Sequence, residues 1–266
     1  MSQEMIVNLI IGLTIPFLGT ILGSACVYLI KDKINQTLQK ILLGFASGVM
    51  VAASIWSLII PAINQSESMG KLNFAPAAIG VAAGMLFLFL IDKITPHIHI
   101  HNDIKEKEGP KSSFKDNTML FLAITIHNIP EGMAVGIIFA GYLANNVVIS
   151  SSAALALAIG IAVQNFPEGV VVSLPFRIEG RSKNKAFLFG TLSGVVEPIA
   201  AAITIAISYY ISPAMPYLLA FAAGAMLYVV VEELIPEAST EPHSNGAVLG
   251  FGFGFILMMI LDIVLG

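Results

Sequence analysis

Eight apolar stretches constrain the fold of this sequence more than any other feature. Each is about 20 residues or longer, the length at which a helix crosses a hydrocarbon core of about 30 Å. In lipid, a helix also satisfies every backbone N–H and C=O group within one segment. The stretches lie near residues 5–30, 40–62, 75–95, 118–142, 149–175, 186–211, 213–236 and 246–265.

The composition agrees with a chain that lives in a bilayer. Of the 266 residues, 56% are hydrophobic and 11% are charged, whereas a soluble domain carries about 25% charged residues. We therefore predict an all-α polytopic membrane protein, with eight transmembrane helices in a single transporter-like domain over residues 1–266. The net charge of −4 gives no sign of nucleic-acid binding, and the single cysteine, Cys26, excludes an internal disulfide.

The basic residues predict the orientation in the membrane. Twelve of the thirteen Lys and Arg residues fall on one side of the predicted helices, and Lys71 alone falls on the other. By the positive-inside rule, that basic side is cytoplasmic and both termini face outward. Short loops favour a bacterial inner membrane as the host. The twelve residues are Lys31, Lys33, Lys40, Lys93, Lys105, Lys107, Lys111, Lys115, Arg177, Arg181, Lys183 and Lys185.

Two related motifs place ionisable side chains inside apolar stretches. Box 1 is His127-Asn-Ile-Pro-Glu-Gly and box 2 is Gln164-Asn-Phe-Pro-Glu-Gly. An ionisable group at mid-membrane costs at least about 2.5–3.5 kcal/mol, so its presence in both boxes indicates a function. Spacings of three and four residues place the polar side chains of a box on one helical face. The proline in each box frees a backbone carbonyl one turn earlier, near Ile126 and Val163.

These donors predict a site for divalent metal ions. Facing carboxylates in a low dielectric repel each other unless they are protonated or bound to metal. One imidazole with oxygen donors suits Zn²⁺ and also Fe²⁺, Mn²⁺ or Cd²⁺. Glu197 either completes a second metal position or carries protons, and the Asn and Gln side chains alone would also fit a role in joining helices. The candidate ligands are His127, Asn128, Glu131, Gln164, Asn165, Glu168 and Glu197.

Further residues are candidates for a pathway through the membrane. Met50, Ser54 and Ser57 recur at helical spacing in the second stretch. On the cytoplasmic side, a loop at about 96–117 contains alternating histidines, a pattern that often binds metal weakly. We expect this loop to be mobile and assign it no secondary structure. Two interpretations of this region are open: a metal exit or sensing region, or a solvated loop beside an acidic helix end. Its candidate residues are His97, His99, His101, Glu232, Glu233, Glu237 and His243.

The stretches also match one another at long range. Residues 45–50 resemble residues 221–226, and box 1 resembles box 2. Weaker matches join residues 84–92 to 254–262 and residues 12–16 to 194–198, although shared apolar composition would also produce such likeness. Because the matched helices run in opposite directions, we predict a 3+2+3 arrangement with inverted symmetry, which is typical of transporters.

At the two boxes the sequence resembles the ZIP (Zrt/Irt-like) family of metal transporters, and the form of box 2 resembles the GufA-like branch. The resemblance implies import of Zn²⁺ and related cations through a binuclear centre, in a homodimer that moves in an elevator-like way. In family terms, His127, Glu131, Gln164 and Glu168 match the first metal position. Asn128, Asn165 and Glu197, with the two shared glutamates, match the second. Many members have His where this chain has Gln164.

The leading prediction is therefore a divalent metal transporter without enzymatic activity or an organic cofactor. One alternative is an intramembrane metal-dependent hydrolase, but the His-Glu-x-x-His helix typical of such enzymes is missing. The other alternative is a proton-coupled transporter of an organic substrate, with Glu131, Glu168 and Glu197 as proton relays.

The difference between the boxes generates a first prediction. Gln164→His adds a second imidazole to the first ligand set, so it should shift metal preference or affinity while the protein stays folded. Competition between Zn²⁺, Fe²⁺, Mn²⁺ and Cd²⁺ for uptake into proteoliposomes measures the shift. Unchanged preference and affinity would place Gln164 outside the coordination sphere.

Overall fold

The computed structural model describes residues 2–30, 35–95, 97–101, 104–108, 110, 115–144, 149–241 and 244–266, with the backbone alone for 97–101, 104–108 and 208–212. Within these residues, eight helical spans are long and apolar enough to cross a membrane. Their ends lie within four residues of the predicted stretches. The prediction of a polytopic all-α membrane protein is confirmed.

The spans are built from the following elements. The first contains α1 (Gln3–Ala25), the second contains α2 (Gln36–Ala53) and α3 (Ile60–Asn64), and the third is α4 (Ala75–Ile94). The fourth and fifth are α5 (Asp116–Leu143) and α6 (Ser151–Ile178), and the sixth combines α7 (Lys183–Gly194) with α8 (Val196–Ile211). The seventh contains α9 (Met215–Val229) and α10 (Ile235–Ala238), and the eighth is α11 (Gly246–Leu265).

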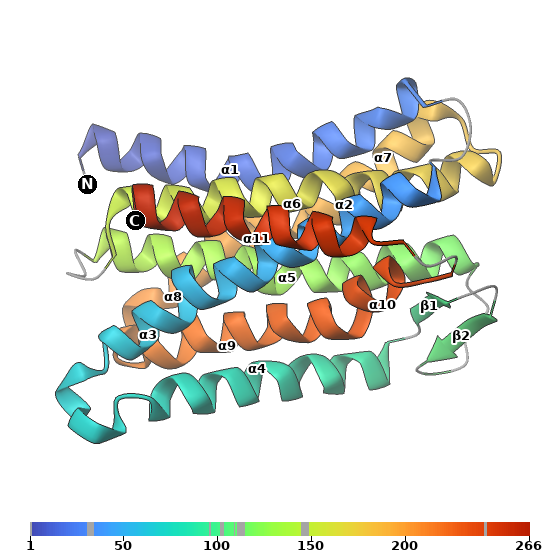
Figure 1. The fold of residues 1–266 in the computed structure, drawn as a ribbon. Helices are drawn as coiled ribbons and strands as arrows, with labels where there is room; N and C mark the ends of the chain where they lie inside the picture. Colours follow the sequence, from blue (N-terminus) through green and yellow to red (C-terminus); the bar gives the residue numbers. More distant parts are fainter. Residues whose placement is uncertain are drawn as a thin grey trace.

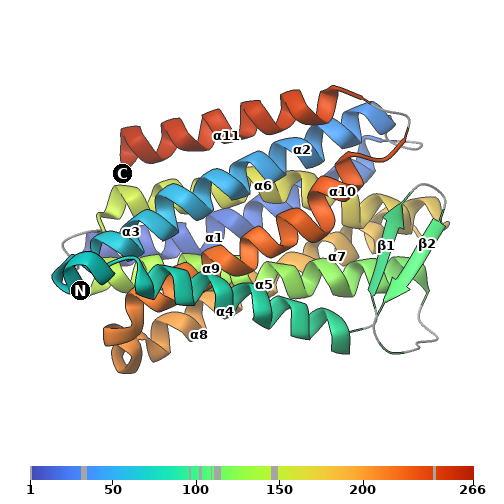
Figure 2. The same ribbon diagram turned by 60° about the horizontal axis from the view of Figure 1, so that its bottom comes forward.

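The long helices lie side by side along one common direction (Figure 1). The amino and carboxyl termini lie together at one end of the bundle, as an even number of spans requires, and this end is called the terminal end below. Strands β1 (His97–His101) and β2 (Ile104–Glu108) lie at the opposite end, the hairpin end (Figures 1 and 2).

The two strands correct one expectation. We assigned no secondary structure to the loop at 96–117, but β1 and β2 form an antiparallel pair in which His97 lies opposite Glu108 and His99 opposite Glu106. Residues 97–101 alternate Ile with His, and such a period of two favours a strand. The hairpin also has support from the bundle, because β1 contacts α5 and α10.

Four pairs of helices make the most extensive contacts, namely α1 with α6, α2 with α11, α4 with α9 and α5 with α8. Glycine allows the backbones in these pairs to touch. A Cβ atom on Gly48 of α2 would lie 2.1 Å from the carbonyl oxygen of Phe251, and one on Gly254 of α11 would lie 2.2 Å from that of Phe45. Small residues of this kind are the usual means of close packing between membrane helices.

Two spans contain a widened π-helical turn, at Ser54–Ile59 in the second span and at Val230–Leu234 in the seventh. Each turn ends just before a proline, Pro61 or Pro236. Because proline has no N–H group, it cannot donate the usual backbone hydrogen bond to the carbonyl one turn earlier. The preceding turn widens as a result. The two turns begin nine residues after Phe45 and nine residues after Phe221, the first residues of the matched motifs.

A second prediction follows from the contact between α2 and α11. Gly254→Ala places a methyl group against the Phe45 carbonyl, so it should lower the unfolding temperature in detergent, whereas Gly252→Ala meets no atom within 4 Å and should leave it unchanged or slightly raised. Thermal unfolding of the two purified variants measures the difference. Equal midpoints would contradict the close contact.

Candidate metal centre

The polar side chains of both boxes are buried in the middle of the bundle. Box 1 lies on α5 and box 2 on α6, and the two helices contact each other and run in opposite directions. The seven predicted ligands are all at most 7% exposed. The structure therefore buries every one of them inside the bundle.

A break in the sixth span brings Glu197 to the same region. The helix is interrupted at Val195, and α8 begins at Val196, so Glu197 lies in the first turn of α8. The partial positive charge of a helix amino terminus favours a carboxylate there. Pro198 is tolerated next to it because N–H groups in the first turn have no partner within the helix.

Carboxamides of box 2 connect the three helices. The amide nitrogen of Gln164 donates a hydrogen bond to Glu131 Oε1 at 2.7 Å, which joins box 2 to box 1. The amide nitrogen of Asn165 donates to Glu197 Oε2 at 2.7 Å and to the carbonyl oxygen of Pro16 at 3.2 Å. The site thus includes a backbone group of α1, which was not among the predicted residues.

His127 lies between two carboxylates from other helices. Its Nε2 atom is 3.5 Å from Asp92 Oδ1 at the end of α4, and its Nδ1 atom is 2.9 Å from Glu233 Oε2 in the seventh span. Glu233 was predicted only as part of the cytoplasmic region. Asp92 was missed as a site residue, although an acidic residue inside an apolar stretch was a signal that could have identified it.

Four buried oxygen atoms of the boxes have no hydrogen-bond partner among the described residues. They are Asn128 Oδ1, Glu131 Oε2, Gln164 Oε1 and Asn165 Oδ1. An unpaired buried acceptor costs free energy, so buried polar groups are normally paired. In the part of the chain that the structure describes, no group of three or more His, Cys, Asp and Glu side chains is already arranged as a metal site. The unpaired oxygens instead come mainly from carboxamides.

A narrow cavity of about 30 Å³ reaches from the boxes toward the hairpin end. This volume holds a water molecule or an ion. Its polar lining comes from both boxes and from the seventh span, and its apolar lining includes Leu120 and Ile124, which lie on α5 between box 1 and the hairpin end. The polar lining residues are His127, Asn128, Glu131, Glu168, Glu233 and Glu237.

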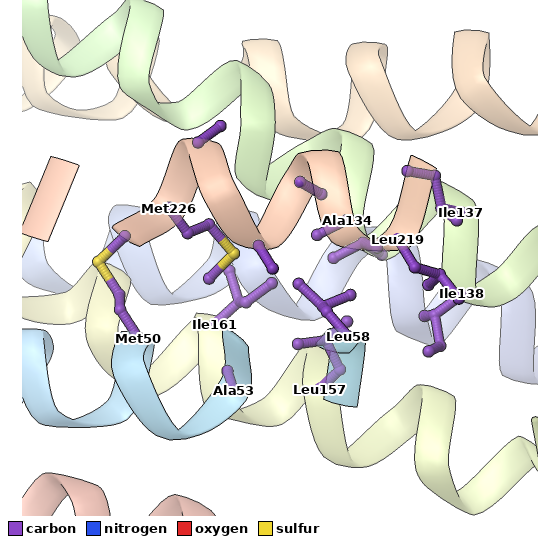
Figure 3. Close-up of a cluster of buried hydrophobic side chains, with 14 of the residues drawn as sticks. Met50, Ala53, Leu58, Ala134, Ile137, Ile138, Leu157, Ile161, Leu219 and Met226 are labelled. Carbon is purple, nitrogen blue, oxygen red and sulfur yellow. The ribbon is translucent and has the colours of Figure 1, made fainter. Parts of the chain in front are cut away.

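Figure 3 shows buried apolar side chains that pack together in the bundle, and the helix positions of those on α5 and α6 place them between the boxes and the terminal end. Met50 and Met226 lie close together there, with Leu157 and Ile161 of α6 beside them. These four side chains are fully buried. Buried apolar side chains thus lie on the terminal side of the site, and polar groups line the cavity on the hairpin side.

The predicted pathway residues of the second span lie apart from the cavity. Met50 belongs to the apolar cluster. Ser54 donates a hydrogen bond to the Met50 carbonyl of its own helix, and Ser57 donates to both carboxylate oxygens of Asp262, at 2.9 and 2.7 Å. A role for them in conduction stays a prediction.

The predicted cytoplasmic residues are divided in the same way. Glu233 and Glu237 line the cavity, and Glu237 Oε1 accepts a hydrogen bond from Gln39. Glu232 is half-buried and is not among the lining residues. His97, His99 and His101 belong to β1, whose backbone alone is described, and His243 lies outside the described residues.

An ion pair joins the two box helices at their hairpin ends. Lys115 Nζ lies 2.8 Å from Glu179 Oε1, and Asn117 donates to the other carboxylate oxygen at 3.3 Å. The hydrogen bond from Lys115 is the main reason that the pKa of the Glu179 carboxyl lies below its usual value. This surface pair contributes little to stability, but it provides a charge outside the membrane core for comparison with the buried glutamates.

A membrane bundle with buried carboxylates, an imidazole and carboxamides at its centre is the architecture of an ion carrier. Comparison with known proteins agrees. A family profile described as ZIP Zinc transporter matches residues 99–262. The chain is 38% identical to zinc transporter ZIP11 of Xenopus tropicalis, over 94% of this chain and 96% of that protein.

Two bacterial relatives are similar to the chain over most of its length. It is 36% identical to zinc transporter ZIPB of Bordetella bronchiseptica, over 97% of this chain and 81% of that protein. It is also 36% identical to zinc transporter GufA of Myxococcus xanthus, over 93% and 96%. The chain belongs to the ZIP family of zinc transporters, so it is a divalent metal transporter and not an enzyme.

A third prediction concerns Asp92. If His127 binds the metal through one ring nitrogen, Asp92 at the other nitrogen orients the ring, and loss of such a group typically costs about 10–100-fold in metal affinity. Asp92→Ala should therefore weaken Zn²⁺ binding by about 10–100-fold, measured by isothermal titration calorimetry. Glu67→Ala, which removes an exposed carboxylate near the terminal end, is the control and should bind as the wild type does. Equal affinities would mean that the orientation of His127 does not depend on Asp92.

Proposed function

We propose that this protein moves divalent metal cations, Zn²⁺ first and also Fe²⁺, Mn²⁺ and Cd²⁺, toward the cytoplasm through a binuclear site between α5, α6 and α8. The observation that carries the proposal is the set of four unpaired oxygen atoms from the two boxes. Hard and borderline cations are bound by carboxylate, carbonyl and imidazole groups, which are the donors that converge here.

The proposed ligands form two neighbouring sets. His127, Glu131, Gln164 and Glu168 form the first position. Asn128, Asn165 and Glu197 form the second, and Glu131 and Glu168 bridge the two. Rotation of the Gln164 and Asn165 amide groups by half a turn exchanges the positions of nitrogen and oxygen. The unpaired amide oxygens would then face the carboxylates that the nitrogens now contact, and a cation would bind between them. Ligands without thiolate also allow the release that transport requires.

Access to the site alternates in this proposal. The cavity on the hairpin side reaches His127 and Glu131, whereas the apolar cluster around Met50 and Met226 closes the terminal side. Metal would leave past Glu233 and Glu237 toward the hairpin, where Glu108 and Glu106 lie opposite His97 and His99 in the strand register. We assign the hairpin end to the cytoplasm because twelve of the basic residues belong to that side of the helices.

The fold also supports a 3+2+3 inverted repeat. In such a repeat, the first three spans correspond in order to the last three, and α5 corresponds to α6. The repeat then relates the contact of α1 with α6 to the contact of α8 with α5. The pair α2 with α11 becomes α9 with α4. These are the four most extensive helix contacts, and the two π-helical turns also occupy matching positions. We further propose a homodimer in a bacterial inner membrane, with no organic cofactor and with the exposed apolar faces of α4 and α11 available for contact.

A fourth prediction tests the function directly. Glu131→Ala and Glu168→Ala each remove a bridging carboxylate, so each should lower Zn²⁺ uptake into proteoliposomes to the level of protein-free vesicles. Glu179→Ala removes a carboxylate outside the membrane core and should leave uptake unchanged. Size-exclusion chromatography of each variant establishes that it is folded.

The outcomes also separate the alternatives. Undiminished Zn²⁺ flux in both glutamate variants would refute metal transport through this site. Proton flux that requires the two glutamates together with an organic solute, and no metal flux in the wild type, would favour a proton-coupled carrier. Peptide or ester turnover that requires them would favour a hydrolase.

A further inference from the structure

Many hydroxyl side chains in these membrane helices bond within their own helix, whereas those of Thr20 and Ser57 donate across the bundle to a carboxylate. A Ser or Thr hydroxyl in a helix usually donates to the carbonyl four residues earlier. Thr14, Ser24, Ser47, Ser54 and Thr125 all do so, at 2.6 to 2.8 Å. Thr20, on the same helix as Thr14, instead donates across the bundle to Glu197 Oε1, at 3.3 Å.

The side chain of Thr20 is held in this orientation by its surroundings. It is 1% exposed. A Cβ atom on Gly194 of α7 would lie 2.7 Å from Thr20 Oγ1, and one on Gly169 of box 2 would lie 2.3 Å from the Thr20 carbonyl oxygen. Thr20 therefore fits between two glycines, one beside box 2 and one just before the break that places Glu197. The close approach of Gly194 limits the space into which the Thr20 side chain can turn, and that of Gly169 is to the Thr20 backbone.

The hydrogen bond leaves the two oxygens of Glu197 in different surroundings. Oε1 accepts from Thr20, whereas Oε2 accepts from the amide of Asn165. Asn165 also contacts the Pro16 carbonyl, one turn before Thr20. Two groups of α1 thus contact ligands of the proposed second position. The Thr20 hydroxyl contacts Glu197, and the Pro16 carbonyl contacts Asn165. Such supporting groups fix the rotamer of a metal-ligating carboxylate.

We propose that Thr20 is a positioning residue for the second metal position. Its hydroxyl holds Oε1 of Glu197, so that Oε2 is the oxygen presented to the metal ion. The role rests on the proposed function, because Glu197 must be a ligand for its orientation to matter. The Thr20 hydroxyl donates to Glu197, which belongs to the second position alone, so the two positions should respond differently when the hydroxyl is removed.

Three variants test this role. Thr20→Val keeps the shape of the side chain and its packing against Gly169 and Gly194 but removes the donor. Thr20→Ser restores the donor. Thr14→Val makes the same change on the same helix, at a hydroxyl that bonds only to its own helix. Zn²⁺ titration calorimetry of the purified proteins resolves the two binding steps, and proteoliposome uptake gives KM and maximal rate.

Thr20→Val should weaken one of the two binding steps by about 10–100-fold and leave the other within about twofold, with a raised KM for uptake. Thr20→Ser should recover most of the affinity, and Thr14→Val should match the wild type. Two unchanged binding steps in Thr20→Val would overturn the role of Thr20 while the wild type still transports metal. Equal weakening of both steps, or no recovery in Thr20→Ser, would reduce Thr20 to a packing residue. Failure of the proposed function is distinguishable, because the wild type itself would then bind and transport no metal.

Discussion

The rest of the structure depends on the cost of burying carboxylates at the centre of a membrane bundle. Glu131, Glu168 and Glu197 are at most 7% exposed. Neighbouring carboxamides of box 2 contact two of them, Glu131 and Glu197. Each such group would be costly at a lipid-facing position, so three of them require internal hydrogen-bond donors together with either protonation or an ion of opposite charge. The carboxamides of Gln164 and Asn165, the Thr20 hydroxyl and the helix start at Glu197 all serve this need. One of the two π-helical turns, Val230–Leu234, also contains Glu233, which lines the cavity beside these groups.

Most of the fold could be predicted from the sequence, because crossing a bilayer imposes a length and a composition that few sequences meet by chance. The ends of the eight spans and the two boxes followed from these requirements. The interior of the spans was harder. Ser54 and Ser57 appeared to share a face with Met50, but the π-helical turn that begins at Ser54 changes the spacing, and Ser57 meets Asp262. A period of 3.6 residues does not hold across such a turn.

Contacts between distant segments account for the remaining differences. Asp92 lies at the end of α4, which packs mainly on α9, and reaches His127 of α5 from there, and Thr20 reaches Glu197 across 177 residues of sequence. Neither contact has a local signal that fixes its partner. The hairpin was missed for a related reason. A polar loop of alternating residues reads equally well as a disordered segment, and contacts of β1 with α5 and α10 decide between the two.

The glycine contacts have a mechanical consequence. Where two backbones touch at Gly48 and Gly254, no side chain lies between them that could repack as the helices slide. A pair joined in this way is a stiff unit whose members move together. The deformable surfaces are the seams between pairs, where long flexible side chains such as Met50 and Met226 meet. If access to the site alternates as proposed, we expect the movement to occur at those seams, where the flexible methionine side chains can change rotamer.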